Sequence, residues 1–317
     1  MYYTKKRKIK KGPIIFIAVV IFIIILIIVC INLYKHYTSF EYKLGEAGYN
    51  EKEIKEILKF DNKYIKYAIE NKYEDDFIPL LKQKYFIWKN YDRYIKYIND
   101  VYGDKKVDYE KVVSLVNAGA DNDPYTHTKK TDMDKEYAIL VNKYNSLPEK
   151  YAPDDIVEMS NWYAYPDNRI RQTVYDAFKE MSEGAKESGY TLIVNSSYRS
   201  YEEQKEIYDD YERNRGKEYA DKYAARPDFS EHQTGLSLDI FSPGANMSNF
   251  ADTETYKWLK DNSYKYGFIL RYPLGKEDIT GYNYEAWHYR YLGKELAKKV
   301  YDSGLTYDEY YAYYLDK

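Results

Sequence analysis

The apolar residues of this 317-residue chain follow three patterns along its length. Residues 14–31 form an unbroken, uncharged apolar run, which as a helix is long enough to cross the hydrocarbon core of a bilayer. From about residue 40 to residue 102 apolar residues recur at helical spacing, as at Ile54 and Ile57, after a capping-box signature at residues 50–53. Beyond them, helical stripes alternate with short runs typical of strands. We therefore expect a transmembrane helix, a small helical region and a mixed domain.

The third pattern decides the fold class. An apolar stripe from Ile170 to Ala185 predicts a helix, which Gly189 closes. Ser200 begins a second capping box, so Arg199 lies at a strand-to-helix turn. A further helix is expected near Trp258, and strand patterns occur at residues 191–194, 236–241 and 268–270. This alternation favours an α+β domain with a small antiparallel sheet flanked by helices, which we place at residues 107–317.

Six basic residues precede the apolar run and predict its orientation. By the positive-inside rule the amino-terminal end is cytoplasmic and everything after the run lies outside. The run is longer than the apolar part of an ordinary cleaved signal, and residues 29–32 offer no small-x-small cleavage site. We expect residues 1–13 to be a basic cytoplasmic tail, 14–33 a signal anchor and 34–106 a membrane-proximal helical region. A cleaved signal peptide is the alternative.

Composition excludes some classes of protein. Cys30, inside the apolar run, is the only cysteine, so the exported part forms no disulfides and needs a substantial core. The net charge is −3 overall and about −9 after the six amino-terminal basic residues, with acids and lysines interspersed. Such a surface does not suit the phosphate backbone of a nucleic acid.

Two of the four histidines stand beside carboxylates. His232 precedes Asp239 by seven residues, and Glu285 precedes His288 by three. His232, Asp239 and His288 would give a zinc ion three protein ligands and leave a fourth position for water, which is typical of a catalytic site. Glu285 could take a proton from that water. Each spacing alone is a weak signal, and a structural histidine beside a surface aspartate or a two-histidine, one-carboxylate iron site are the competing interpretations.

Further strings carry a resemblance that covers roughly residues 110–295. Together the motifs resemble those of the VanY-type D-alanyl-D-alanine carboxypeptidases and the related L,D-carboxypeptidases of bacterial cell walls. The matching strings are Tyr151-x-Pro-Asp-Asp155, Ser196-Ser-Tyr-Arg-Ser200, Ser230-Glu-His-Gln-Thr-Gly235 with Asp239, Tyr266-Gly-Phe-Ile269 with Arg271-Tyr-Pro273, and Glu285-Ala-Trp-His-Tyr-Arg-Tyr291.

The resemblance implies a zinc peptidase that removes the terminal D-alanine from peptidoglycan stem peptides. It assigns one zinc ion to His232, Asp239 and His288, and the role of general base to Glu285. Arg199 would stabilise negative charge on the substrate. Gln204 and Ser230 resemble residues of the family that hold the substrate, and Arg271 is a second candidate for binding the substrate carboxylate.

Three other functions stay open. The enzyme could be an L,D-carboxypeptidase acting on tetrapeptide stems, or an endopeptidase that cuts cross-bridges, and a wall-binding or sensor module is the non-enzymatic alternative. In the leading hypothesis the chain is a single-pass membrane protein of a Gram-positive type cell surface, with its catalytic domain outside. Its expected partners are the stem peptide and the membrane, with no nucleic acid.

Overall fold

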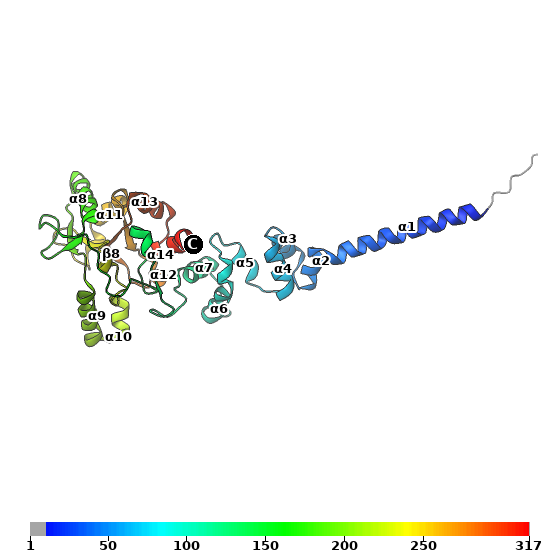
Figure 1. Cartoon of the computed structure of the whole chain (residues 1–317), viewed down its shortest axis with the longest axis horizontal. Coiled ribbons are helices and arrows are strands. Elements are labelled where there is room, and N and C mark those ends of the chain that lie inside the picture. The colour runs from blue at the N-terminus through cyan, green and yellow to red at the C-terminus, as the bar shows by residue number, and fades with distance from the viewer. Residues whose placement is uncertain (1–10, 317) are drawn as a thin grey trace, which may run out of the picture. The chain divides into compact units, whose positions relative to one another are not determined.

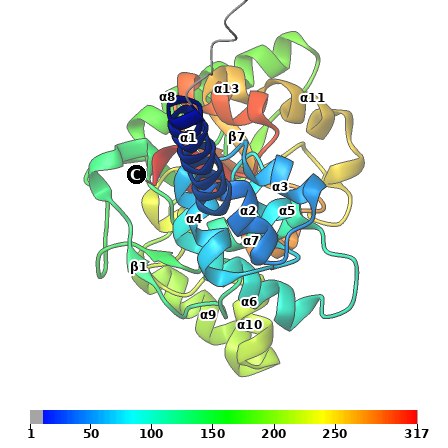
Figure 2. The ribbon, with the colours of Figure 1, turned by 90° about the vertical axis from the view of Figure 1, so that its right-hand side faces the viewer.

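The computed structural model describes residues 11–316, so most of the expected cytoplasmic tail lies outside the described residues. The chain divides between Phe86 and Ile87 into two compact units. In the first unit, α1 (Lys11–Thr38) is one continuous helix, drawn in dark blue in Figures 1 and 2. Its segment Phe16–Thr38 has a mean hydropathy of 3.5 and none of it is buried, so it could cross a membrane by length and composition, as a signal sequence also could.

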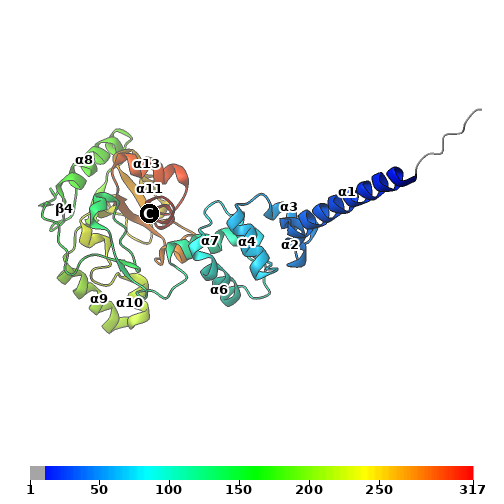
Figure 3. The ribbon, with the colours of Figure 1, turned by 45° about the vertical axis from the view of Figure 1, so that its right-hand side comes forward.

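The rest of the first unit is a cluster of short helices (Figure 3). They are α2 (Phe40–Glu46), α3 (Glu51–Ile57), α4 (Asn62–Asn71) and α5 (Phe77–Leu81). Asn50 and Glu53 form the expected capping box at the start of α3. Leu44, Ile57 and Phe77 are completely buried, so these helices share a small apolar core.

The second unit begins earlier than the boundary expected at residues 106/107. A 3-10 turn (Trp88–Asn90) and α6 (Tyr91–Val101) pack against α7 (Tyr109–Ala118). The Asn90 side chain donates to Asn117 at 2.8 Å, and Arg93 Nε donates to Asp121 at 3.0 Å. The helix that ends near residue 101 therefore belongs with the mixed domain and not with the membrane-proximal helices.

A four-stranded antiparallel sheet organises the second unit, which confirms the expected α+β class. Its order is β5 (Ile193–Ser196), β6 (Ser237–Phe241), β8 (Glu285–Tyr291) and β7 (Phe268–Tyr272). Two small ladders accompany it: β1 (Lys129–Lys130) with β2 (Asn145–Ser146), and β3 (Ile156–Glu158) with β4 (Arg169–Arg171).

Helices flank this sheet (Figures 1 and 3). α8 (Gln172–Glu187) buries Val174, Phe178, Met181 and Ala185, as the apolar stripe predicts. Ile170, expected in the same helix, lies instead in β4, where Val157 is its pairing partner, and the helix starts two residues later. The remaining helices are α9 (Tyr201–Arg215), α10 (Lys217–Tyr223), α11 (Glu254–Asn262), α12 (Glu277–Thr280), α13 (Lys294–Ser303) and α14 (Tyr307–Tyr310), with 3-10 turns at Met133–Ala138, Glu231–Thr234, Phe250–Asp252 and Ser263–Tyr266 and a π turn at Tyr311–Leu315.

Candidate metal centre

A tight turn brings His232 back over strand β6. His232 lies in the 3-10 turn Glu231–Thr234, and Gly235 ends it with a φ of 66°. A Cβ at Gly235 would lie 2.7 Å from Cγ of Arg171 and 2.9 Å from Cδ1 of Ile156. Both the left-handed backbone and the close contact require glycine here. The expected turn at residues 234–235 is therefore confirmed.

The sheet register brings Asp239 and His288 together. Asp239 of β6 pairs directly with His288 of β8, and antiparallel partners project their side chains to the same face. Ser237, Asp239 and Phe241 alternate with Leu238 and Ile240, both completely buried in the apolar core. The period-two pattern of residues 236–241 thus places Asp239 on the face opposite to these apolar side chains.

A bulge in β8 adds Glu285 to the same face. Residues three apart on a regular strand point to opposite faces. Here Leu270 pairs with Tyr289, but Tyr272 pairs with Glu285, so β8 gains residues between these two pairs. As a result Oε2 of Glu285 lies 3.4 Å from Nδ1 of His288.

Three buried side chains offer a set of metal ligands. Oδ1 of Asp239 lies 3.5 Å from Nε2 of His232 and 3.3 Å from Nδ1 of His288, and the three ligand atoms lie within 4.8 Å of one another. Oδ1 of Asp239 is buried and accepts no hydrogen bond from any residue in the described part of the chain. A buried acceptor without a donor needs a compensating partner, and a cation held between two imidazoles and a carboxylate supplies one. The residues therefore fit a zinc ion.

Each imidazole is oriented by its other nitrogen. Nδ1 of His232 lies 2.7 Å from the carbonyl oxygen of Ser197, and Nε2 of His288 lies 3.3 Å from Oε2 of Glu231. A carbonyl oxygen only accepts, so Nδ1 of His232 carries the proton and Nε2 keeps its lone pair toward Asp239. Such outer partners fix the rings of metal-binding histidines.

Glu231 is a site residue that the sequence reasoning missed. Its side chain is almost completely buried, and Oε1 accepts from Nε of Arg271 and Nη1 of Arg290, both at 2.7 Å. Burial alone would raise the pKa of Glu231, but the two guanidinium groups hold it well below its usual value. The only sequence signal was its place beside His232, because no periodicity marks a buried charge.

The structure contradicts the expected role of Arg271. Its side chain has no exposed surface, and its guanidinium group donates to Glu231 and to both carboxylate oxygens of Asp308. It is not among the residues that line the cavity at the metal ligands. The prediction that Arg271 binds substrate is therefore wrong, because its donors are already used inside the protein.

Arg199, in contrast, reaches the cavity. Its Nη1 donates to Oε1 of Gln204 at 2.8 Å, its Nε donates to Ser196 at 3.3 Å, and its Nη2 lies 3.8 Å from Oδ2 of Asp239. Gln204 is itself fixed by donating to the carbonyl of Ala225 at 2.8 Å. The buried Gln204 thus orients the fork of Arg199, and the capping box of Ser200 and Glu203 that begins α9 is as expected.

These residues line a cavity of about 540 Å³. Arg199, Gln204, Ser230 and Glu285 lie in its wall with the three metal ligands, so apart from Arg271 all predicted site residues come together. Aromatic side chains complete the lining: Tyr211, Tyr223, Tyr272, Tyr282, Tyr284 and Trp287. The cavity is thus a polar centre within largely aromatic walls, a common arrangement of small-ligand sites.

The two carboxylates at the centre differ in acidity. Burial raises the pKa of Glu285 to about 7, with Asp239 acting in the same direction and His288 opposing it. Burial would also raise the pKa of Asp239, but His232 and His288 lower it well below its usual value. Asp239 is therefore a permanent anion, whereas Glu285 can gain and lose a proton near neutral pH.

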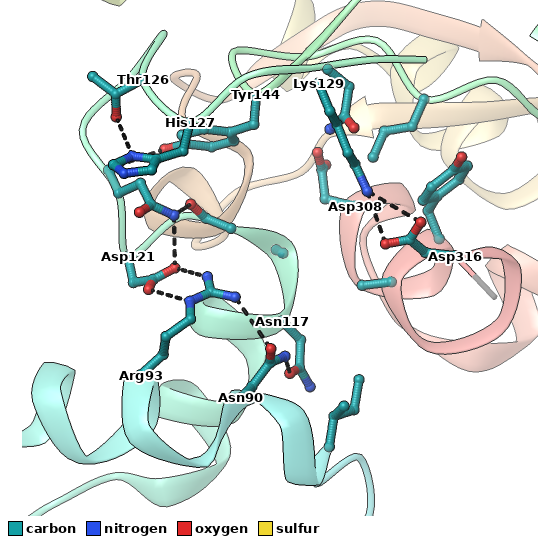
Figure 4. A pocket seen from close by; sticks show the side chains of 18 of the residues that line it. Asn90, Arg93, Asn117, Asp121, Thr126, His127, Lys129, Tyr144, Asp308 and Asp316 are labelled. Atoms are coloured by element: carbon teal, nitrogen blue, oxygen red, sulfur yellow. Dashed lines mark hydrogen bonds and ion pairs between the residues drawn. The ribbon is translucent and has the colours of Figure 1, made fainter. Parts of the chain in front are cut away.

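A larger cavity of about 900 Å³ lies elsewhere in the second unit. Figure 4 shows Asn90, Arg93 and Asn117 on one side of it and Lys129, Asp308 and Asp316 on another. Arg93 is paired with Asp121, and Lys129 with Asp316. His127 lies here beside Thr126, and none of the metal-ligand candidates lines this cavity. Chemistry, and not volume, therefore identifies the smaller cavity as the candidate active site.

Comparisons with known proteins agree with this site. The sequence profile of the family "VanY: D-alanyl-D-alanine carboxypeptidase" matches residues 167–294, which include every predicted site residue. The chain is 45% identical over 179 residues to YodJ of Bacillus subtilis (strain 168), a protein provisionally named a carboxypeptidase, and this match covers 54% of this chain and 66% of YodJ. It is 30% identical over 252 residues to a D-alanyl-D-alanine carboxypeptidase of Enterococcus faecium, covering 74% of this chain and 78% of that one.

A solved structure shows the same architecture. The LD-carboxypeptidase LdcB, whose structure was described as revealing the molecular basis of peptidoglycan recognition, superposes with a TM-score of 0.56 at 39% identity. The superposition covers 66% of this chain and 92% of LdcB. By the two sequence matches, the chain spans just under two thirds of the length of YodJ and more than three quarters of the length of the enterococcal carboxypeptidase.

Proposed function

The chain belongs to the family of VanY-type D-alanyl-D-alanine carboxypeptidases, and we propose that it is a zinc-dependent carboxypeptidase that removes the terminal D-alanine from peptidoglycan stem peptides. The observation that carries the proposal is the buried trio of His232, Asp239 and His288 next to Glu285, in which Oδ1 of Asp239 accepts no hydrogen bond from the described residues. A metal-dependent hydrolase needs three such ligands and one nearby carboxylate.

The protein's own groups would divide the chemistry. His232, Asp239 and His288 would hold a zinc ion, which would supply Lewis acidity and lower the pKa of a bound water molecule. Glu285 would accept the proton of the attacking water and donate it to the leaving amine, a role that suits a carboxylate whose Oε2 lies 3.4 Å from Nδ1 of the ligand candidate His288. Asp239 stays ionised throughout, because its pKa is held low.

Arg199 would bind the negative charge of the substrate. Nη1 is engaged with Gln204, and Nη2 lies 3.8 Å from Oδ2 of Asp239 within the cavity wall, so the guanidinium is held beside the ligand set. Its planar fork can hold the terminal carboxylate or the developing oxyanion. Ser230 and Gln204 lie in the same wall, where Ser230 would contact the peptide and Gln204 would keep Arg199 in place.

An L,D-carboxypeptidase acting on tetrapeptide stems is the second candidate. The structural similarity to LdcB, an LD-carboxypeptidase, favours it. The two activities differ in the configuration of the penultimate residue, so the walls of the cavity around that side chain decide between them. We place D,D activity first because both the family profile and the enterococcal relative are D-alanyl-D-alanine carboxypeptidases.

We further propose that α1 anchors the enzyme in the membrane, with the amino terminus in the cytoplasm and the second unit outside. The exposed apolar segment Phe16–Thr38 and the basic residues that precede it support this orientation. An anchored enzyme would act where its peptidoglycan substrate is built.

Mass spectrometry of cleaved stem peptides tests the proposal. The full-length protein in detergent is incubated with stem pentapeptide and with stem tetrapeptide, with and without a chelator. We expect one alanine to be lost from the pentapeptide, the loss to stop with chelator, and zinc to restore it. Loss from the tetrapeptide alone would make the protein an L,D-carboxypeptidase. A zinc-loaded protein that cleaves neither peptide would refute both candidates and leave the endopeptidase or wall-binding alternative.

A further inference from the structure

A chain of buried charged side chains runs from the metal ligand His288 to the C-terminal helix α14. Nε2 of His288 lies 3.3 Å from Oε2 of Glu231, and Nε of Arg271 donates to Oε1 of Glu231 at 2.7 Å. Both terminal nitrogens of Arg271 donate to the carboxylate of Asp308, on α14. Glu231, Arg271 and Asp308 are each at most 3% exposed.

The formal charges of these buried side chains cancel, and both carboxylates accept hydrogen bonds from groups inside the protein. Arg290 also donates to Glu231, so two guanidinium groups balance two carboxylates. Oε2 of Glu231 accepts a further hydrogen bond from Ser237 at 3.1 Å, and Oδ1 of Asp308 accepts one from Asn142 at 2.8 Å. Buried ions survive only when paired and hydrogen-bonded in this way, and removal of one partner leaves an uncompensated charge on the next.

We propose that Arg271 and Asp308 are positioning residues of the metal centre: Asp308 holds Arg271, Arg271 holds Glu231, and Glu231 sets the ring of His288. The inference rests on the proposed function, since it takes His288 as a metal ligand. It gives Arg271 a role that needs no contact with substrate. A bidentate guanidinium transmits orientation better than a point charge, because its planar fork fixes the angle between its two partners.

The inference extends the metal centre beyond the region that defines the family profile. The match to the profile ends at residue 294, whereas Asp308 lies on α14. Thr306 and Glu309 close a capping box on α14, and the hydroxyl of Tyr307 donates to the carbonyl of Ala138 at 2.7 Å. A short helix far along the chain is thereby fixed where its carboxylate meets Arg271.

Glu309 is the matched control, because it is the next residue and is also a buried carboxylate. It bonds to Thr306 and to Ser114, and so fixes α14 without contacting Arg271. Zinc affinity is measured by competition with a chromophoric chelator for the full-length wild type, Asp308→Asn and Glu309→Gln. We expect Asp308→Asn to weaken zinc binding about tenfold, the lower end of the effect of outer partners of metal ligands. Glu309→Gln should lower the melting temperature but leave zinc affinity within about twofold.

Kinetics and three further variants complete the test. Asp308→Asn should lower kcat with KM nearly unchanged, because the substrate-binding wall is intact. If Asp308 acts through Glu231, the double variant with Glu231→Gln should bind zinc no more weakly than Glu231→Gln alone. Arg271→Lys, which keeps the charge but lacks the fork, should also weaken zinc binding, and it serves if Asp308→Asn does not fold.

The outcomes separate the two proposals. If the wild type, Asp308→Asn and Arg271→Lys bind zinc with equal affinity, this inference is overturned and the proposed function stands. Equal losses of affinity in Asp308→Asn and Glu309→Gln would also overturn it, because the effect would then come from loosening α14. A wild type without zinc affinity would overturn the proposed function and this inference with it.

Discussion

At the scale of single residues, the candidate site shows how surroundings assign different tasks to similar groups. Asp239 and Glu285 are both carboxylates near His288, yet the pKa of Asp239 is lowered whereas burial raises that of Glu285 to about 7. Asp239 faces two imidazole nitrogens. Glu285, at the start of β8, faces only Nδ1 of His288 among the described imidazole nitrogens. A permanent anion suits a metal ligand, and a group that titrates near pH 7 suits proton transfer.

This contrast predicts the effect of Glu285→Gln. The amide keeps the size of the side chain but cannot accept a proton, so kcat should fall about 10²- to 10⁴-fold. Because the three ligand atoms come from other residues, zinc content and melting temperature should stay near those of the wild type. Hydrolysis of the stem pentapeptide and zinc analysis of the same sample measure both. Turnover at the wild-type rate would remove Glu285 from the mechanism.

A second residue-scale prediction concerns Lys143, whose ammonium group lies beside Tyr282, a residue in the wall of the smaller cavity. It donates to the carbonyl of Asp221 at 2.6 Å and lies 4.4 Å from the ring centre of Tyr282. Burial lowers the pKa of Lys143 to about 8, so above pH 8 the folded protein binds fewer protons than the unfolded chain. Stability from this group must then rise with pH until the unfolded lysine also titrates, near pH 10.5.

Lys143→Met isolates this contribution, because methionine cannot titrate. Relative to the variant, the wild type should gain about 2 kcal/mol of unfolding free energy between pH 7.5 and pH 9.5. Urea unfolding of both proteins at several pH values measures the difference, and common effects of pH on the remaining groups cancel. A difference that does not change with pH would show that Lys143 keeps an ordinary pKa.

At the scale of secondary-structure elements, the sequence predicts regular features better than irregular ones. The alternation around Leu238 and Ile240 was enough to place Asp239 on the polar face of β6, and capping residues marked the starts of α3 and α9. The bulge in β8 has no such signal, since Glu285 and His288 in a regular strand would face apart. Irregular register depends on packing against β7, which the local sequence does not encode.

Gly235 allows a test of one irregular element, the turn that carries His232. Gly235→Ala would require a left-handed φ and would also place a methyl group 2.7 Å from Arg171. Gly244 has a φ of +82° but nothing within 4 Å of its added Cβ, so Gly244→Ala introduces only the backbone strain. We expect a loss of about 3 kcal/mol for Gly235→Ala and about 1 kcal/mol for Gly244→Ala. Zinc affinity should fall in the first variant only, because only its turn moves His232; an equal effect on zinc in both would contradict this.

At the scale of the whole molecule, the sequence predicts the class of the domains more reliably than their limits or their buried charges. The apolar segment and the α+β class follow from local patterns, and His232, Asp239 and His288, which their spacing marks only weakly, do come together in the structure. The roles of Arg271 and Glu231 do not follow from local patterns, because an arginine near a motif is equally suited to substrate binding or to a buried ion pair. Which one occurs depends on Asp308, 37 residues along the chain from Arg271. Long-range pairing of this kind is decided by the fold and not by spacing.

The limit of the catalytic unit gives a last, quantitative prediction. The break between compact units lies at Phe86/Ile87, and α6 buries Tyr91, Tyr94 and Ile98 within the second unit. A fragment of residues 107–317 would lose α6 and leave the apolar surface of α7 uncovered, whereas a fragment of residues 87–317 keeps both.

Burial of two or three such side chains contributes about 5 kcal/mol, which corresponds to about 10–20 °C in melting temperature for a unit of this size. Thermal unfolding by circular dichroism should therefore show the longer fragment melting cooperatively and at the higher temperature. No residue of 87–106 lines the cavity of the candidate metal centre, so both fragments should bind zinc when folded at low temperature. Equal melting temperatures would mean that residues 87–106 belong, as the sequence alone suggested, to the membrane-proximal helices.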